Sequence, residues 1–536
     1  MPGVMTLGLA LAASPAAATA MPAPTAMPAP TPGLDAYLTA RVADRDGAVQ
    51  QAAAGYAAAL AASPDNPVVA LRAYREAIRA GDLDLADRAA AVLTAHHAAP
   101  VDAPLLAIAR AAAAGDTAAA RRALAGLDSG PLRVLVPALD RWIAGRAGGA
   151  VPVDPVAQRF ARESDALLQL ARGDVAAGMA AIGPLLAADR AGPDQAAQDL
   201  RLAAARLLMG RGQDGAARTL LVGDASPVAA LRERPRGQGA RPTLAFGVAY
   251  LFTRIASDLS PGEPGPIGYA LIRGALRADP GDDRARILLA AALSKDDAVD
   301  RGIAELAAIG PDSIYAANAR AGRVQLLAAK GDSDAALAEA RVLAEAPGAT
   351  DADRLRLAEL YLRFDRPAGA AVIYRALTTR VGAVQDGTIW LQYGAALDRA
   401  GQWPEARAAL ERAVALAPGD PIALNYLGYA LVEHGEQPDT AQALLERAAA
   451  LKPGDAAITD SLGWSLLRRG QVARAIPLIE RAAAADPVNA EIAEHLGDAY
   501  WQAGRRYEAR YAWTAARVSA QPPATTRLDA KIADGL

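Results

Sequence analysis

The sequence predicts an all-α fold, a right-handed superhelical solenoid of stacked helix–turn–helix hairpins. Two observations carry this prediction. Gly394, Gly428, Gly463 and Gly497 are spaced by 34, 35 and 34 residues, a period typical of helical repeats that stack on their neighbours. Hydrophobic residues make up 52% of the 536 residues but aromatic residues only 4%. Alanine, the best helix former, therefore supplies most of the apolar content.

The N-terminus is expected to hold an export signal followed by a linker. An apolar run, Val4–Ala13, precedes a small-x-small cleavage site at Ala18-Thr19-Ala20, so residues 1–20 are interpreted as a signal peptide. No Lys or Arg precedes the apolar run, which leaves a disordered tail on a cytoplasmic protein as the alternative. Residues 21–32 repeat a proline-rich phrase and predict an extended linker, because proline blocks helical hydrogen bonding.

Residues 33–130 are expected to form the first hairpins. Gly47, Gly81 and Gly115 are spaced by 34 and 34 residues, and each lies where a first helix should end. Glycine suits this place because it adopts the left-handed conformation past a helix end without strain. The hairpins are predicted at 33–66, 67–100 and 101–130.

The repeat pattern loosens over residues 131–316. Proline and glycine gather at 222–242 and 258–268, which predicts two loops. The segment is interpreted as degenerate hairpins, with a separate small helical domain as the alternative. Hairpins resembling the repeat are expected again over 317–386.

The C-terminal residues 387–523 predict four regular units, with 524–536 as a tail. The glycines of the 34-residue series lie in similar phrases, WLQYGAAL, LNYLGYAL, TDSLGWSL and AEHLGDAY. These units resemble tetratricopeptide repeats, and more closely the tetratricopeptide proteins of the proteobacterial envelope. That resemblance implies a non-catalytic adaptor that holds other proteins, in some relatives delivering substrates to envelope proteases.

Helical spacing also predicts a partner-binding groove. Residues three before, one after and four after each repeat glycine share one stripe of the first helix, opposite the side that packs in the hairpin. Aromatic side chains there could bury large areas, and carboxylates would select basic or amide-rich polypeptides. The alternative is that the aromatic residues pack between adjacent hairpins. The candidate groove residues are Asn425, Tyr429, Asp460, Trp464, Glu494, Asp498 and Trp501.

Several other classes of site find no support in the sequence. The net charge of −3 gives no electrostatic case for nucleic acid, and the absence of cysteine excludes disulfides, thiolate metal sites and lipoprotein anchoring. No uninterrupted apolar stretch of membrane-spanning length follows the N-terminus. Gly210–Gly215 matches GxGxxG but follows a helical pattern, so it is interpreted as a turn between helices. No catalytic residue, cofactor or metal site is assigned.

One basic cluster stands apart in this sequence. Arg232, Arg234, Arg236 and Arg241 are expected on a solvated loop, with contact to an anionic lipid or glycan surface as the alternative.

The predicted function is a scaffold in envelope biogenesis or protein quality control in the periplasm. Two alternatives remain. One is an enzyme with a catalytic site hidden in 131–316, since carboxylates alone can support glycosidase chemistry. The other is a cytoplasmic scaffold.

Overall fold

The computed structural model describes residues 33–187, 195–223, 226–260, 262, 265–380 and 386–536. These residues form 29 α-helices and two short 3₁₀ helices, with no β-strand among them, so the all-α solenoid class is confirmed. The expected signal peptide and linker lie outside the described residues. Among the helices described, none combines the length and the apolar character that a membrane crossing requires.

The helices divide into two compact units. One comprises the described residues up to Ala197 together with Arg241–Asp282, and the other comprises Gln198–Ala240 together with Asp283–Leu536. The segment 131–316, expected as one degenerate stretch, is therefore shared between the two units.

The first unit begins with three regular hairpins. The turns inside them fall at Gly47, Gly81 and Gly115, whose φ angles of 72°, 90° and 68° are in the left-handed region that favours glycine. The helices of this unit are α1 (Leu34–Arg45), α2 (Val49–Ala62), α3 (Pro67–Ala80), α4 (Leu83–Ala95), α5 (Ala103–Ala113), α6 (Thr117–Leu124), η1 (Ala125–Leu127), η2 (Pro131–Leu135), α7 (Val136–Ala144), α8 (Pro155–Arg172), α9 (Val175–Ala187), α13 (Leu244–Leu259) and α14 (Pro266–Ala278).

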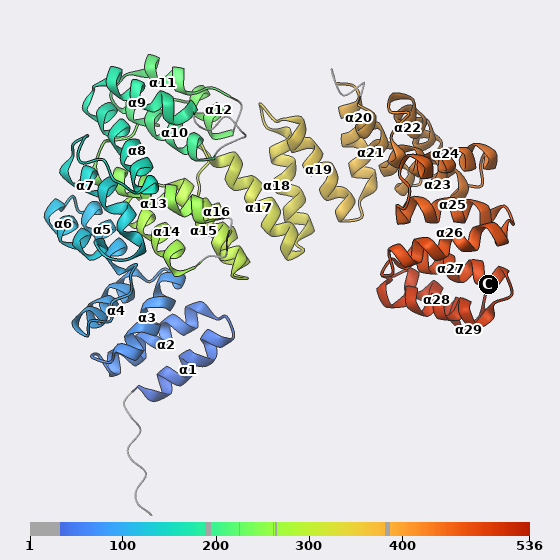
Figure 1. Ribbon diagram of the computed structural model, residues 1–536, viewed down its shortest axis with the longest axis horizontal. Coiled ribbons are helices and arrows are strands. Elements are labelled where there is room, and N and C mark those ends of the chain that lie inside the picture. Colours follow the sequence, from blue (N-terminus) through green and yellow to red (C-terminus); the bar gives the residue numbers. More distant parts are fainter. Residues whose placement is uncertain (1–32, 188–194, 224–225, 261, 263–264, 381–385) are drawn as a thin grey trace, which may run out of the picture. The chain divides into compact units, whose positions relative to one another are not determined.

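Helices α13 and α14 do not continue the row of hairpins but pack back on α3, α5 and α7 (Figure 1). The cause lies in the sequence of α13, where every residue from Gly247 to Ala256 is buried, and a helix that is apolar nearly all round must be enclosed. Arg277 on α14 makes a bidentate ion pair with Asp87 on α4, at 2.9 and 2.5 Å. The first-helix side of the N-terminal hairpins is thus covered by the chain itself.

The second unit follows the expected order more closely, because consecutive helices from α15 to α28 pack on one another. Its helices are α10 (Gln195–Gly210), α11 (Asp214–Leu220), α12 (Ser226–Glu233), α15 (Asp283–Lys295), α16 (Val299–Ala307), α17 (Ala316–Lys330), α18 (Ser333–Glu345), α19 (Asp351–Arg363), α20 (Pro367–Thr378), α21 (Gly387–Arg399), α22 (Trp403–Leu416), α23 (Pro421–Glu433), α24 (Pro438–Leu451), α25 (Ala456–Arg468), α26 (Val472–Ala485), α27 (Ala490–Gln502), α28 (Arg506–Ser519) and α29 (Ala524–Asp534).

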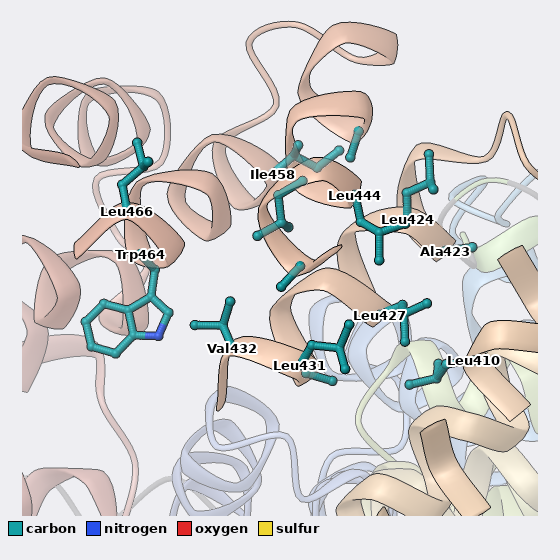
Figure 2. Close-up of a cluster of buried hydrophobic side chains, with 14 of the residues drawn as sticks. Leu410, Ala423, Leu424, Leu427, Leu431, Val432, Leu444, Ile458, Trp464 and Leu466 are labelled. Carbon is teal, nitrogen blue, oxygen red and sulfur yellow. The ribbon is translucent and has the colours of Figure 1, made fainter. Parts of the chain in front are cut away.

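The repeating glycines allow the two helices of each C-terminal hairpin to approach closely. A Cβ atom on Gly394 would lie 2.6 Å from Leu410 on the second helix, and one on Gly497 would lie 2.3 Å from Trp513. The same close approach occurs at the two glycines between them. Behind these contacts the buried side chains form one core that extends through successive hairpins (Figure 2).

The segment expected as a tail, 524–536, is largely helical. It forms α29, whose Leu528 is fully buried in a small core with Trp513 and Ala516 of α28. The apolar end of the last hairpin is therefore covered by the C-terminal segment.

Candidate functional site

The seven predicted groove residues lie on the first helices of three successive C-terminal units. Four are buried, with exposed fractions of 4% for Asp460, 8% for Trp464, 7% for Glu494 and 5% for Asp498. The other three are half-buried: Asn425 and Tyr429 on α23, and Trp501 on α27. The helical spacing brings them into one row, and most of that row contacts the chain itself.

Trp464 packs between hairpins, as the structural alternative for the aromatic residues expects. Its ring stacks on the imidazole of His495 on α27, with centroids 4.0 Å apart. Its Nε1–H donates to the carboxylate of Glu433 on α23 at 2.6 Å. Trp464 on α25 therefore joins the first helices of three neighbouring units.

His495 is the buried polar centre of this row. Its Nδ1 lies 2.7 Å from Oδ2 of Asp460. Burial alone disfavours the imidazolium, but the bond to Asp460 and the nearby carboxylates of Glu491 and Asp498 raise the pKa of His495 above its usual value. The structure thus favours a charged histidine between two tetratricopeptide-like hairpins.

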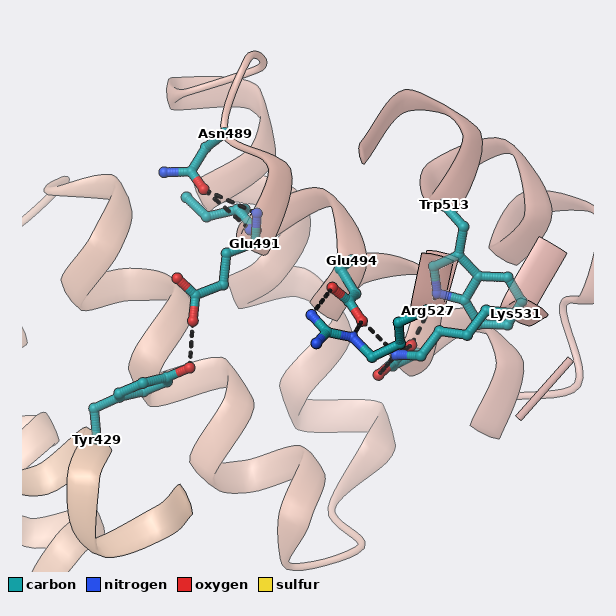
Figure 3. A network of polar contacts seen from close by, with 9 residues as sticks. Tyr429, Asn489, Glu491, Glu494, Trp513, Arg527 and Lys531 are labelled. Atoms are coloured by element: carbon teal, nitrogen blue, oxygen red, sulfur yellow. Dashed lines mark hydrogen bonds and ion pairs between the residues drawn. The ribbon is translucent and has the colours of Figure 1, made fainter. Parts of the chain in front are cut away.

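Tyr429 on α23 extends past α25 of the neighbouring unit and contacts α27 of the unit after it. Its hydroxyl donates to the carboxylate of Glu491 at the start of α27 (Figure 3). Burial raises the pKa of the Tyr429 phenol, and the carboxylate of Glu491 raises it further. The Tyr429–Glu491 bond makes the row a continuous surface from α23 to α27.

The acids of the last unit hold the C-terminal helix. Glu494 accepts two hydrogen bonds from Arg527, at 2.8 and 2.7 Å, and one from Lys531 at 2.7 Å (Figure 3). Lys531 also contacts both oxygens of Asp498, at 2.8 and 2.7 Å. Burial opposes ionisation of Glu494, but the two cations outweigh it and lower its pKa to about 2.

Asp498 also serves the packing of the last hairpin, because Oδ1 accepts the indole N–H of Trp513 at 2.8 Å. Trp501 lies one turn further along α27, beside Gly535 after α29. The guanidinium of Arg506 covers its ring, 3.7 Å from the centroid. Three of the seven predicted residues thus contact or adjoin the C-terminal segment.

Two acceptor oxygens of the row have no hydrogen-bond donor in the part of the chain that the structure describes. They are Oδ1 of Asn425 and Oδ1 of Asp460, both inaccessible to solvent. An unsatisfied buried acceptor is unfavourable by roughly 1–3 kcal/mol.

The GxGxxG sequence proves to be a turn between helices, as predicted. Gly210 ends α10, and the next helix begins at Asp214. A Cβ on Gly210 would lie 2.1 Å from the carbonyl oxygen of Ala240, whose N–H donates to the carbonyl of Arg206 at 2.8 Å. The glycine is required by a crossing loop, which explains the motif without a nucleotide.

Three arginines of the predicted cluster, Arg234, Arg236 and Arg241, lie on the loop between α12 and α13, whereas Arg232 lies in the last turn of α12. Arg232 donates to the carbonyls of Leu221 and Gly223, at 3.1 and 3.0 Å, and Arg234 to that of Pro311 at 3.3 Å. These two guanidinium groups therefore hydrogen-bond to neighbouring backbone, and all four arginines of the cluster are exposed.

A cluster of ionisable groups in 131–316 links α8 to α13. Glu163 accepts from the Tyr250 hydroxyl at 2.8 Å and from Arg159 at 3.2 Å, and burial raises its pKa. Arg254 is fully buried and donates to Asp258 at 2.5 Å. With 5% of its side chain exposed, Glu163 joins two packed helices.

Two family models, both described as tetratricopeptide repeat, match residues 388–430 and 461–524. The chain contains tetratricopeptide repeats in these two segments. The matched segments contain all of α27 and parts of α21, α23 and α25, the first helices of the units described above. Because stacked tetratricopeptide units present extended surfaces to other chains, the family supports an interaction scaffold. No curated protein matches the chain in sequence.

Three similar solved structures each cover less than half of this chain. MamA from Desulfovibrio magneticus RS-1, from residue 41 to its end, is 21% identical over 32% of this chain and 94% of that one, with a TM-score of 0.28. A tetratricopeptide repeat protein from Parabacteroides merdae is 12% identical over 47% of this chain and 97% of its own, with a TM-score of 0.40. A thermophilic TPR protein of Thermus thermophilus is 21% identical over 34% and 98% of the two chains, with a TM-score of 0.30. Similarities of this extent carry no argument about function.

Proposed function

We propose that this chain is a non-catalytic scaffold that binds partner polypeptides along the first helices of its C-terminal units. The observation that carries the proposal is the continuity of the row from α23 to α27. Tyr429 contacts Glu491 two units away, and Trp464 connects Glu433 with His495. A surface that extends over several units is what an extended or helical polypeptide needs for simultaneous contacts.

The packing of the first unit also favours the C-terminal first helices as the place where a partner binds. In that unit α13 and α14 pack on the first helices α3, α5 and α7. The first-helix side of the N-terminal hairpins is therefore covered by the chain itself. The first helices of the C-terminal units carry the half-buried side chains of Asn425 and Tyr429 and the exposed carboxylate of Glu433. We place the partner there.

The chemistry of the row favours a basic or amide-rich polypeptide. Glu433 and Glu491 are exposed acids on α23 and α27, and each accepts a bond from an aromatic side chain of the row. A Lys or Arg of the partner would form a charge-assisted hydrogen bond with either carboxylate. The Tyr429 ring beside them would supply apolar area with little loss of entropy.

Site-specific photo-crosslinking tests this proposal. A photoreactive amino acid at Asn425 should crosslink partner polypeptides in intact cells, and a second substitution, Tyr429→Ala, should reduce the yield about tenfold or more, as expected for a central aromatic contact. The matched control is the same photoreactive group at Tyr511, which is 79% exposed on α28 and lies off the row. Equal crosslinks from both positions, or none from Asn425, would refute the proposed surface.

We also propose that the scaffold works in envelope biogenesis or protein quality control, in the periplasm. The apolar run near the N-terminus and the similarity of the repeat phrases to envelope tetratricopeptide proteins support this location. N-terminal sequencing of the protein isolated from cells tests it. A mature chain that begins at Met21 supports export, whereas an intact Met1 supports the cytoplasmic scaffold.

A further inference from the structure

The C-terminal helix α29 occupies the acidic end of the proposed binding row. Arg527 and Lys531 are four residues apart, so they project from the same face of α29. Together they contact all four carboxylate oxygens of Glu494 and Asp498, at 2.7–2.8 Å (Figure 3). The acids predicted to select a basic partner thus bind the two basic residues of a helix of the chain itself.

The other contacts of α29 are with α28: Arg510 donates to the carbonyls of Ile532 and Ala533, at 2.9 and 3.4 Å, and Arg517 forms an ion pair with Asp529. Leu528 is the one fully buried residue of α29, with Ile532 partly buried against the same small core. By contrast, α27 buries six of its residues. An isolated helix of 11 residues is marginal in water, so α29 depends on the ion pairs and on Leu528 and belongs to the least stable part of its unit.

Ion pairs of this kind can be exchanged for equivalent ones. The Arg527 side chain remains largely exposed, at 58%, so a competing basic side chain can approach the Arg527–Glu494 ion pair from solvent. A second helix with two basic residues four positions apart would form the same charge-assisted bonds with Glu494 and Asp498. Its apolar residue between them would take the place of Leu528.

We propose that α29 is a displaceable internal ligand, which covers the acidic pair until a partner helix with a basic pair four residues apart replaces it. This rests on the proposed scaffold function and names the class of partner that its last unit recognises. The cost of displacement is set by the effective concentration of α29, on the order of millimolar for a short connection. Release of α29 therefore raises the apparent affinity for the partner helix.

The test uses the full chain and a fluorescent synthetic peptide that copies residues 520–536. Binding is followed by fluorescence anisotropy to the unchanged chain and to the double variant Arg527→Glu/Lys531→Glu, in which α29 loses its hold on the acids. The double variant should bind the peptide at least tenfold more tightly. Adding Glu494→Gln and Asp498→Asn should abolish that gain. The matched control, Tyr511→Glu, introduces a negative charge on α28 at a position that is 79% exposed, and should leave the affinity unchanged.

Hydrogen exchange on the unchanged chain gives a second readout that needs no variant. Amides of α29 should exchange at least tenfold faster than those of α27, because the proposal requires α29 to detach while α27 stays folded. Equal protection of the two helices, equal peptide affinity for the two chains, or binding that survives loss of both acids would overturn the proposal. If one of these results is found while Asn425 still crosslinks partners, the internal-ligand proposal is wrong and the proposed scaffold function stands. If the peptide binds as expected but Asn425 gives no crosslink, α29 is a displaceable ligand and the proposed scaffold surface around Asn425 is wrong.

Discussion

Replacement of Trp464 by alanine should destabilise the C-terminal units strongly. The side chain is 8% exposed, its ring stacks on His495 at 4.0 Å, and its N–H donates to Glu433 at 2.6 Å. Truncation of a buried tryptophan costs about 3–5 kcal/mol. The substitution also leaves His495 and Glu433 without their aromatic partner, so we expect a loss in the upper part of that range.

Native-state hydrogen exchange is the appropriate assay, because stability in a repeat protein is largely local and a single melting temperature would mix units. The free energy of opening should fall by about 3–5 kcal/mol for amides of α25 and α27, with no change in α1–α6. Trp464→Phe keeps a stacked ring but loses the donor, so its effect should be smaller. The control Tyr511→Ala removes an exposed ring and should change stability by less than about 0.5 kcal/mol. Unchanged protection in the Trp464→Ala chain would refute the interpretation of Trp464 as a core residue.

Three other contacts give predictions of their own. Gly497→Ala should destabilise the last hairpin by about 1–3 kcal/mol, because the new methyl group would overlap the Trp513 ring, and chemical denaturation followed by tryptophan fluorescence measures this loss. The pKa of His495 is raised by Asp460 in the folded chain. The stabilisation that protonated His495 provides should therefore be complete below the unfolded pKa near 6.5 and decline as pH rises through the higher folded pKa. Thermal melts at several pH values measure this dependence, and His495→Gln should remove it. Arg273→Ala should weaken the docking of α14 on α3 by about 1.5–3 kcal/mol, because its guanidinium donates to two carbonyls at the end of α3; faster hydrogen exchange in both helices would show this, and unchanged exchange would contradict it.

The sequence predicts the regular part of the fold well because its signal is local. A glycine such as Gly497 is required wherever two helices of a hairpin cross closely, and this requirement recurs with each repeat. The position of α14 on α5 has no such signal, since it joins residues far apart in the chain. The continuous apolar run of α13, LAFGVAYLF, does indicate an enclosed helix, but it does not identify the helices that enclose it.

The candidate site shows the same division. Helical periodicity places Tyr429, Trp464 and Asp498 in one row, as observed, because side-chain direction follows from spacing. It does not show that His495, two residues before the repeat glycine, lies between two units against Trp464. The helix α29 could have been recognised from Leu528 and Ile532, four residues apart, but its contact with the acids depends on tertiary packing alone.

The docking of α13 and α14 on the first hairpins has a consequence during synthesis. A simple repeat array can fold as it leaves the ribosome, because each repeat needs only its neighbour. Here the apolar first-helix faces of α3, α5 and α7 stay uncovered until α14 has been made, more than a hundred residues after α7 ends at Ala144. At about 5–20 residues per second this interval lasts on the order of ten seconds. The nascent N-terminal half would therefore expose apolar surface to which chaperones bind until α13 and α14 cover it.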